Sequence, residues 1–171
     1  MGTLTVDNLN LKGSGSVSSV GRILQIVQTA KTDTFSTTST SFTDVTGFSA
    51  TITPSSTSSK VLVMVSSNSS TSGGNNAIMK LVRGSTDVFV GDDDSASREE
   101  ATAQTRVNDT NAALTLTFNF LDSPSTTSAT TYKLQYKVQA GTGTINRTQA
   151  DSNGATLART ASSIILVEVR G

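Results

Sequence analysis

Apolar and polar side chains alternate with a period of two in the second half of the chain. Over residues 112–122 the apolar set is Leu114, Leu116, Phe118 and Phe120, and over 130–139 it is Tyr132, Leu134, Tyr136 and Val138. This period puts the two sets on opposite faces of a β-strand. Both runs therefore predict strands, and the Ser/Thr/Pro segment between them predicts that they pair as a hairpin.

The rest of the chain after residue 20 also consists of short strand-like runs between turn residues. Strands are expected over 22–29, 60–67, 77–83, 86–90 and 163–169, with one or two more around Phe42, Val45, Phe48 and Ile52, and short ones near 141–147 and 155–159. Ser and Thr make up roughly a third of the residues, and they favour strands and turns. We predict an all-β fold, an antiparallel β-sandwich resembling a jelly roll, with no helix longer than a turn or two.

Residues 1–20 have a different composition, and they predict an N-terminal arm and linker ahead of a sandwich domain over 21–171. Apolar side chains are scattered in the arm, and Gly and Ser follow them as a flexible linker at 12–16. The arm is expected to attach to another subunit or another protein, and the alternative is a frayed tail. The candidate attachment residues are Leu4, Val6, Leu9 and Leu11.

Three of the expected strands, 22–29, 60–67 and 163–169, are apolar on both alternating sets of side chains. One face of a sandwich strand meets the other sheet, so a second apolar face predicts cover by another subunit. The alternative is that these strands lie in mid-sheet under loops. The candidate contact residues are Ile23, Leu24, Ile26, Val61, Val63, Val65, Ile164 and Leu166.

The composition argues against an enzyme and against a cofactor. The chain has no Cys and no His, which removes thiolate chemistry, the usual general base and the commonest transition-metal ligand. Its net charge of zero argues against nucleic-acid binding. Asp92, Asp93 and Asp94 form a weak Ca²⁺ candidate, for which a solvated acidic loop is the better explanation. Tyr132 and Tyr136 alternate with lysines, so a core role is expected for both.

Nothing in the sequence indicates membrane insertion or export. The opening residues lack a basic segment followed by an apolar core, so no signal peptide is expected. The longest apolar stretches, 61–65 and 164–167, are far shorter than a bilayer span. We expect a protein made in the cytoplasm without insertion into a membrane.

Several segments resemble small virion-surface and tail-fibre proteins of marine phages and cyanophages. They include GRILQIVQT at 21–29, SSKVLVM at 58–64, TYKLQYKV at 131–138 and SSIILVEV at 162–169, and the similarity spans about residues 21–170. The resemblance implies a trimeric jelly roll akin to the tumour-necrosis-factor and C1q heads. The eight contact candidates would then form the core of a homotrimer.

The resemblance implies a phage structural protein exposed on the virion surface, acting in host adhesion as a tail-fibre or receptor-binding head. Its partners would be copies of itself, other virion proteins held by the arm, and a host-surface glycan or protein. Receptor contact is expected at the polar loops 69–76, 91–97 and 151–154. The alternatives are a trimeric capsid decoration (cement) protein that stabilises the head and, more remotely, a carbohydrate-binding or glycan-degrading domain.

Overall fold

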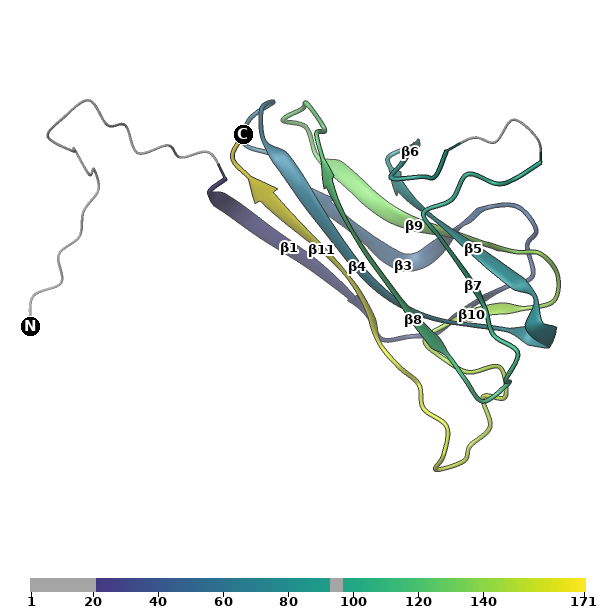
Figure 1. Ribbon diagram of the computed structural model, residues 1–171. Helices are drawn as coiled ribbons and strands as arrows, with labels where there is room; N and C mark the ends of the chain where they lie inside the picture. The colour runs from purple at the N-terminus through teal and green to yellow at the C-terminus, as the bar shows by residue number, and fades with distance from the viewer. Residues whose placement is uncertain (1–20, 93–96) are drawn as a thin grey trace, which may run out of the picture.

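The computed structural model describes residues 21–92 and 97–171, and these residues form an all-β fold (Figure 1). The arm candidates Leu4, Val6, Leu9 and Leu11, and the acidic Asp93 and Asp94, lie outside the described residues. The strands are β1 (Ile23–Lys31), β2 (Phe35–Thr37), β3 (Thr43–Ile52), β4 (Lys60–Thr71), β5 (Asn76–Arg83), β6 (Thr86–Val88), β7 (Ala103–Arg106), β8 (Leu114–Asp122), β9 (Thr130–Val138), β10 (Gly143–Ile145) and β11 (Ser162–Val169).

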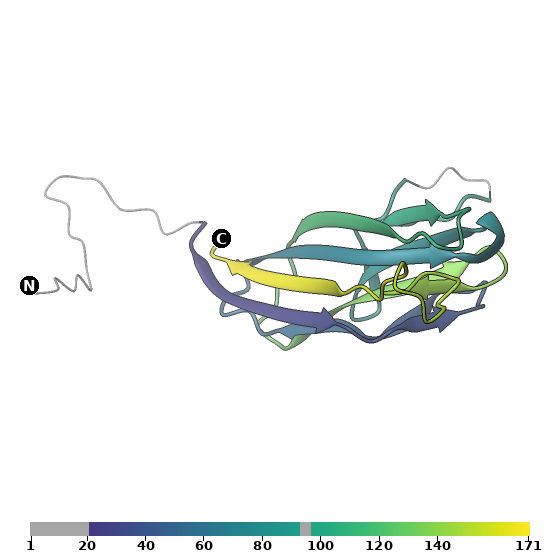
Figure 2. The same ribbon diagram turned by 90° about the horizontal axis from the view of Figure 1, so that it is seen from below.

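The strands form two antiparallel sheets that face each other (Figures 1 and 2). In the first sheet the order is β1-β11-β4-β8, and β2 and β10 continue the lines of β1 and β11 beyond a loop. In the second sheet the order is β3-β9-β5, with β6 and β7 both paired to the far side of β5. The chain passes repeatedly from one sheet to the other through short connections, and the resulting order is that of a jelly roll. The predicted fold class is therefore confirmed as an antiparallel β-sandwich.

Side chains alternate between the two faces of each strand, and the inward-facing apolar ones form the core between the sheets. In β4, Val61, Val63 and Val65 point inward and are at most 4% exposed, whereas Met64 points outward and is 38% exposed. Tyr132 and Tyr136 of β9 are fully buried in the same core, as their alternation with lysines predicted. Their hydroxyls are satisfied by Asp122 of β8 and Ser69 of β4, so polar bonds also join the two sheets.

The predicted hairpin between residues 112–122 and 130–139 is wrong. β8 pairs with β4 in the first sheet, whereas β9 pairs with β3 and β5 in the second. The connecting loop crosses from one sheet to the other, and Ser125 in it has a positive φ of 51°. Alternation identifies a strand and its buried face, but it carries no information about which strand lies alongside.

Two other boundaries differ from those expected. The predicted loop 69–76 begins as strand, because Ser69, Ser70 and Thr71 form the end of β4, pair with β10 and are buried. Only a single 3₁₀ turn, Ser72–Gly74, separates β4 from β5. The short strand expected at 155–159 is irregular loop instead.

An aromatic side chain, 43% exposed, packs between β8 and the end of β6 at the edge of the sandwich. Phe89 follows β6 with a positive φ of 54°, and its ring stacks on Phe120 with centroids 5.2 Å apart. A second contact places the ring of Phe118 at 6.3 Å. Among the described residues, no helix is long and apolar enough to cross a membrane.

Candidate functional site

The most developed polar site lies in the loop of residues 146–161, between β10 and β11. β10 and β11 pair with the same side of β4, one after the other along its length. The loop is therefore inserted between two strands that occupy the same position in the sheet. It protrudes from the end of the sandwich as the yellow-green segment at the foot of Figure 1. Its position at the end of two interior strands suits a binding loop, because the sheet fixes both of its ends.

Asn146 ties the start of this loop to the sheet. Its side-chain amide donates to the carbonyl oxygens of Lys31 at 2.8 Å and Asp33 at 3.0 Å, and its Oδ1 accepts from Ser162 at 2.5 Å. Its backbone has a φ of 65°, a left-handed conformation that Asn tolerates better than most residues. Asn146 is fully buried, and its carbonyl accepts from the N–H of Thr160, so one residue anchors both ends of the loop.

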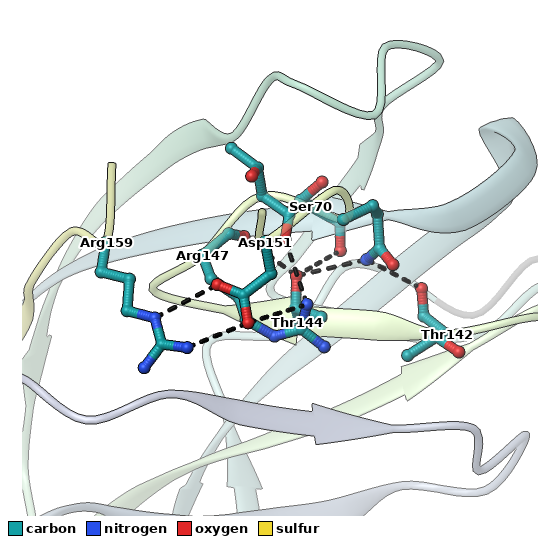
Figure 3. Close-up of polar contacts among 8 residues, drawn as sticks. Ser70, Thr142, Thr144, Arg147, Asp151 and Arg159 are labelled. Atoms are coloured by element: carbon teal, nitrogen blue, oxygen red, sulfur yellow. Dashed lines mark hydrogen bonds and ion pairs between the residues drawn. The ribbon is translucent and has the colours of Figure 1, made fainter. Parts of the chain in front are cut away.

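Two arginines of the loop converge on one carboxylate (Figure 3). The guanidinium of Arg159 donates from Nε to Asp151 Oδ1 at 3.1 Å and from Nη2 to Oδ2 at 3.0 Å, while Arg147 Nη1 lies 3.7 Å from Oδ2. This two-pronged geometry orients the guanidinium of Arg159. Asp151 itself has a φ of 36°, a strained backbone that the ion pairs hold in place. Two positive charges on one negative charge leave the cluster cationic.

A second layer of polar contacts supports the cluster from the sheet side (Figure 3). The hydroxyl of Thr144, on β10, donates to the carbonyl oxygen of Arg147 at 3.0 Å and accepts from Gln149 Nε2 at 3.2 Å. The same Gln149 nitrogen donates to the carbonyl oxygen of Thr142 at 3.2 Å. These bonds fix the backbone of the loop beneath the arginines, so the site is formed before any ligand arrives.

Above this cluster the loop encloses a solvent-open hollow of about 480 Å³. Arg159 lines it with 65% of its side chain exposed, beside hydroxyl, amide and carboxylate groups. These groups donate and accept hydrogen bonds, and Leu157 and Ala158 add the apolar part of a mainly polar lining. The lining residues are Thr148, Asp151, Ser152, Asn153, Gly154, Leu157, Ala158 and Arg159.

The predicted receptor loop 151–154 therefore lies on the wall of this hollow, whereas its supporting residues were not foreseen. Thr144, Asn146 and Arg147 lie within four residues, and Arg159 lies twelve residues further on. Their motif match is the glycosylation sequon Asn146-Arg147-Thr148, which does not point to this site. Of these residues, only Asn146 could have been singled out from the sequence, because Asn tolerates the left-handed backbone conformation that turns require. The tertiary fold brings the four side chains together through the turns of the inserted loop.

The predicted trimer core requires a correction. Val61, Val63, Val65, Ile164 and Leu166 are at most 4% exposed within a single chain, because they point between the sheets. A side chain already enclosed by its own chain has no surface left for a partner. The other three candidates lie on edge strand β1, where Ile23 is 58% and Ile26 is 62% exposed and Leu24 is half-buried.

For the weak Ca²⁺ candidate at residues 92–94, the part of the chain that the structure describes supplies no further ligands. Asp92 is exposed, and its two acidic neighbours lie outside the described residues. Over residues 21–92 and 97–171, no three Asp, Glu, His or Cys side chains gather as a metal site would require.

No protein-family model matches the chain, and no curated protein matches it. Among solved structures, the T=1 particle derived from infectious bursal virus matches with a TM-score of 0.45 and 15% identity, over 98% of this chain and 44% of that chain. The T=13 particle of the same virus matches with a TM-score of 0.45 and 14% identity, over 98% and 40%. The chain spans less than half the length of these viral proteins.

Proposed function

We propose that the chain is a structural protein of a phage virion, exposed on the particle surface, whose jelly-roll head binds a host-surface ligand through the loop 146–161. The observation that carries this proposal is the preformed hollow beside Arg159 and Asp151, held at the end of the sheet by bonds from the buried Asn146. A site organised before binding loses less conformational entropy when its ligand is captured. The sequence resemblance to phage surface proteins supports the virion location.

The chemistry of the hollow favours binding over catalysis. Asp151, the one carboxylate in its wall, is committed to two arginines, and this pairing opposes a role as a general base. The hydroxyls of Ser152 and Thr148 have no His to activate them, because the chain contains none. We therefore propose adhesion without covalent chemistry and without a cofactor.

The adhesion proposal is tested by binding of the purified protein to whole host bacteria and to a glycan array. Arg159→Gln removes the exposed charge of the hollow, and Arg22→Gln, at an exposed position before β1, is the matched control. We expect binding to fall at least tenfold in the first variant and to stay unchanged in the second. Equal binding by both variants, or no binding by the unaltered protein, would overturn the proposal.

Copy number in purified particles separates the receptor-binding head from a capsid decoration protein. A tail-fibre head is present in the small number set by tail symmetry, whereas a decoration protein follows the many positions of the capsid lattice. Quantitative mass spectrometry of the virion measures the ratio of this chain to the major capsid protein. If the number of copies of this chain matches the number of equivalent positions on the capsid lattice, the result favours a decoration protein.

We further propose that the head works as a homotrimer, because three weak sites on one particle reinforce one another. The accessible candidates for this contact are Ile23, Leu24 and Ile26 on edge strand β1. Light scattering of the full chain, and of the chain without residues 1–20, measures the mass. A trimer in both forms supports assembly through the sandwich, and a monomer of the full chain would rule the trimer out.

A further inference from the structure

The outer face of the sheet β1-β11-β4-β8 carries an uninterrupted row of aliphatic side chains. The register pairs Ile26 with Val167, Val167 with Leu62, and Leu62 with Leu121, so the row crosses all four strands. Ile26 and Leu121, at its two ends, are 62% and 54% exposed. No element among the described residues lies over this row (Figure 2). A contiguous apolar row of this kind marks a surface that is normally covered.

A second row of apolar side chains lies next to the first on the same outer face. Ile165 pairs with Met64, and with their neighbours on β4, β8 and β11 they line a shallow hollow of about 250 Å³. Met64 is 38% exposed at its centre. These rows, consisting of Ile26, Leu62, Met64, Leu121, Ile165 and Val167, are called the apolar face below.

The outer face of the other sheet is built differently. On β9 it carries Lys133 and Lys137, and Lys133 pairs with Asp44 of β3 at 2.7 Å. Lys80 of β5 pairs with Asp87 at 2.6 Å. Charged pairs of this kind suit a surface in water, so the apolar face is specific to one sheet of the sandwich.

The size of the apolar face argues against a second copy of the sandwich as its cover. Its two rows are spaced about 6.6 Å along the strands and cross four strands about 4.8 Å apart, so the apolar face presents on the order of 250 Å². A stable protein–protein interface buries about 800 Å² on each partner. A face-to-face pair would therefore need further contacts, whereas one extended peptide segment fits the available area.

The chain itself provides such a segment close to the face. The N–H of Gly21 donates to the carbonyl oxygen of Arg170 at 2.8 Å, so residues 1–20 join the sandwich where β1 and β11 meet. Ile23, two residues later, is exposed and pairs with Val169. The preceding segment contains Leu4, Val6, Leu9 and Leu11, four apolar side chains in two pairs spaced by two residues. In an extended chain each pair places both side chains on one face.

The linker between this segment and Gly21 is long enough to reach. Residues 12–20 span at most about 30 Å at about 3.3 Å per residue. Ile26 lies about 17 Å along β1 from Gly21, and three strand spacings to Leu121 add about 14 Å across the sheet. A short flexible linker also holds a tethered segment at an effective concentration on the order of millimolar. That concentration favours the segment of the same molecule over one from another copy.

We propose that residues 4–11 dock on the apolar face of their own molecule. The apolar side chains of the segment cover the rows centred on Met64, while its polar residues face the solvent. Docking keeps the face from associating with other apolar surfaces. Docking covers Ile26, so a trimer contact on β1 would then use Ile23 and Leu24. The proposal is independent of the hollow at residues 146–161 and of any ligand bound there.

Cysteine pairs test the placement directly, because the chain contains no cysteine of its own. Val6→Cys with Met64→Cys joins the segment to the apolar face, and Val6→Cys with Ser49→Cys, an exposed position on β3 of the other sheet, is the control. After mild oxidation at low protein concentration, we expect an intramolecular disulfide formed several-fold faster in the first pair. Equal rates in both pairs, or a disulfide formed only between molecules, would overturn the proposal.

Oxidation of the methionines by peroxide provides a second test that keeps the native face intact. Met64 lies on the apolar face and Met79 is fully buried in the core, so Met79 reports whether the fold is unchanged. In a variant with Leu4, Val6, Leu9 and Leu11 changed to Ser, we expect Met64 to be oxidised several-fold faster than in the unaltered chain, at a constant Met79 rate. An unchanged Met64 rate would show that the segment does not cover the face.

Discussion

Tyr132 of β9 donates a 2.6 Å hydrogen bond to Asp122 Oδ2 of β8, and this bond joins the two sheets through their buried interior. The same carboxylate oxygen accepts from Arg83 Nη1 of β5 at 2.6 Å. Burial, followed by the hydrogen bond and charge of Asp122, raises the pKa of Tyr132 above its ordinary value, so the phenol remains a donor. The strand pair predicted as a hairpin is thus held together by side chains rather than by a backbone ladder.

Removing this donor should destabilise the sandwich. In Tyr132→Phe the buried carboxylate of Asp122 loses one partner, and hydrogen bonds to charged groups contribute about 1.5–3 kcal/mol. Tyr136→Phe, which removes a neutral 2.8 Å bond to Ser69, is the matched control with an expected loss of about 1 kcal/mol. Urea unfolding measures both. Equal losses would show that the charge on Asp122 adds nothing.

Neighbouring residues of β11 should differ sharply in their contribution to stability. Leu166 points into the core and is fully buried, so Leu166→Ala should lower the free energy of unfolding by about 2–5 kcal/mol. Ile165 points to the apolar face and is only half-buried, so Ile165→Ala should cost less than half as much. Denaturant titration of the two variants checks the inward and outward assignment, and a reversed order would contradict it.

Gly143 of β10 should accept no side chain. A Cβ at this position would lie 2.5 Å from Val138 Cγ1 and 2.7 Å from the Tyr136 hydroxyl, inside a closed core. We expect Gly143→Ala to destabilise by at least about 1–3 kcal/mol, because packed cores tolerate little added volume. Gly154→Ala, where nothing approaches closer than 3.8 Å, should leave the melting temperature unchanged. Similar melting temperatures for the two variants would contradict this packing.

Stability should fall at acidic pH through Glu168, which is fully buried at the end of β11. Burial raises its pKa, but hydrogen bonds from Gln25 and Ser55 outweigh that effect and lower the pKa from 4.5 to about 2. Because the folded pKa is depressed, the stabilisation is present above the unfolded pKa and is lost as pH falls toward 2. Glu168→Gln should flatten this part of the stability profile in denaturant titrations between pH 2 and pH 6. An unchanged slope would assign the acid sensitivity to other groups, such as Asp33 and Asp44.

The sequence identified most strands and the buried side of several of them. The alternation of Tyr132, Leu134, Tyr136 and Val138 correctly marked the inward face of β9. In β4 and β11 both sets are apolar, and the sequence did not show which set meets the other sheet. The inward set was assigned to an oligomer contact, whereas the exposed apolar side chains of these strands, such as Met64, belong to the other set.

The sequence by itself determined that this chain forms an all-β sandwich, because a period of two in side-chain polarity is a local property of each strand. Only the tertiary structure decided that β8 and β9 lie in different sheets, and that Asn146, Asp151 and Arg159 build one site. The sheet assignment depends on backbone pairing between residues distant in the sequence, and the site depends on the bonds that tie Asn146 to Lys31 and Asp33. These contacts are set by the packing of the whole chain. The local pattern of apolar and polar residues does not specify which strands pair or which loop residues meet.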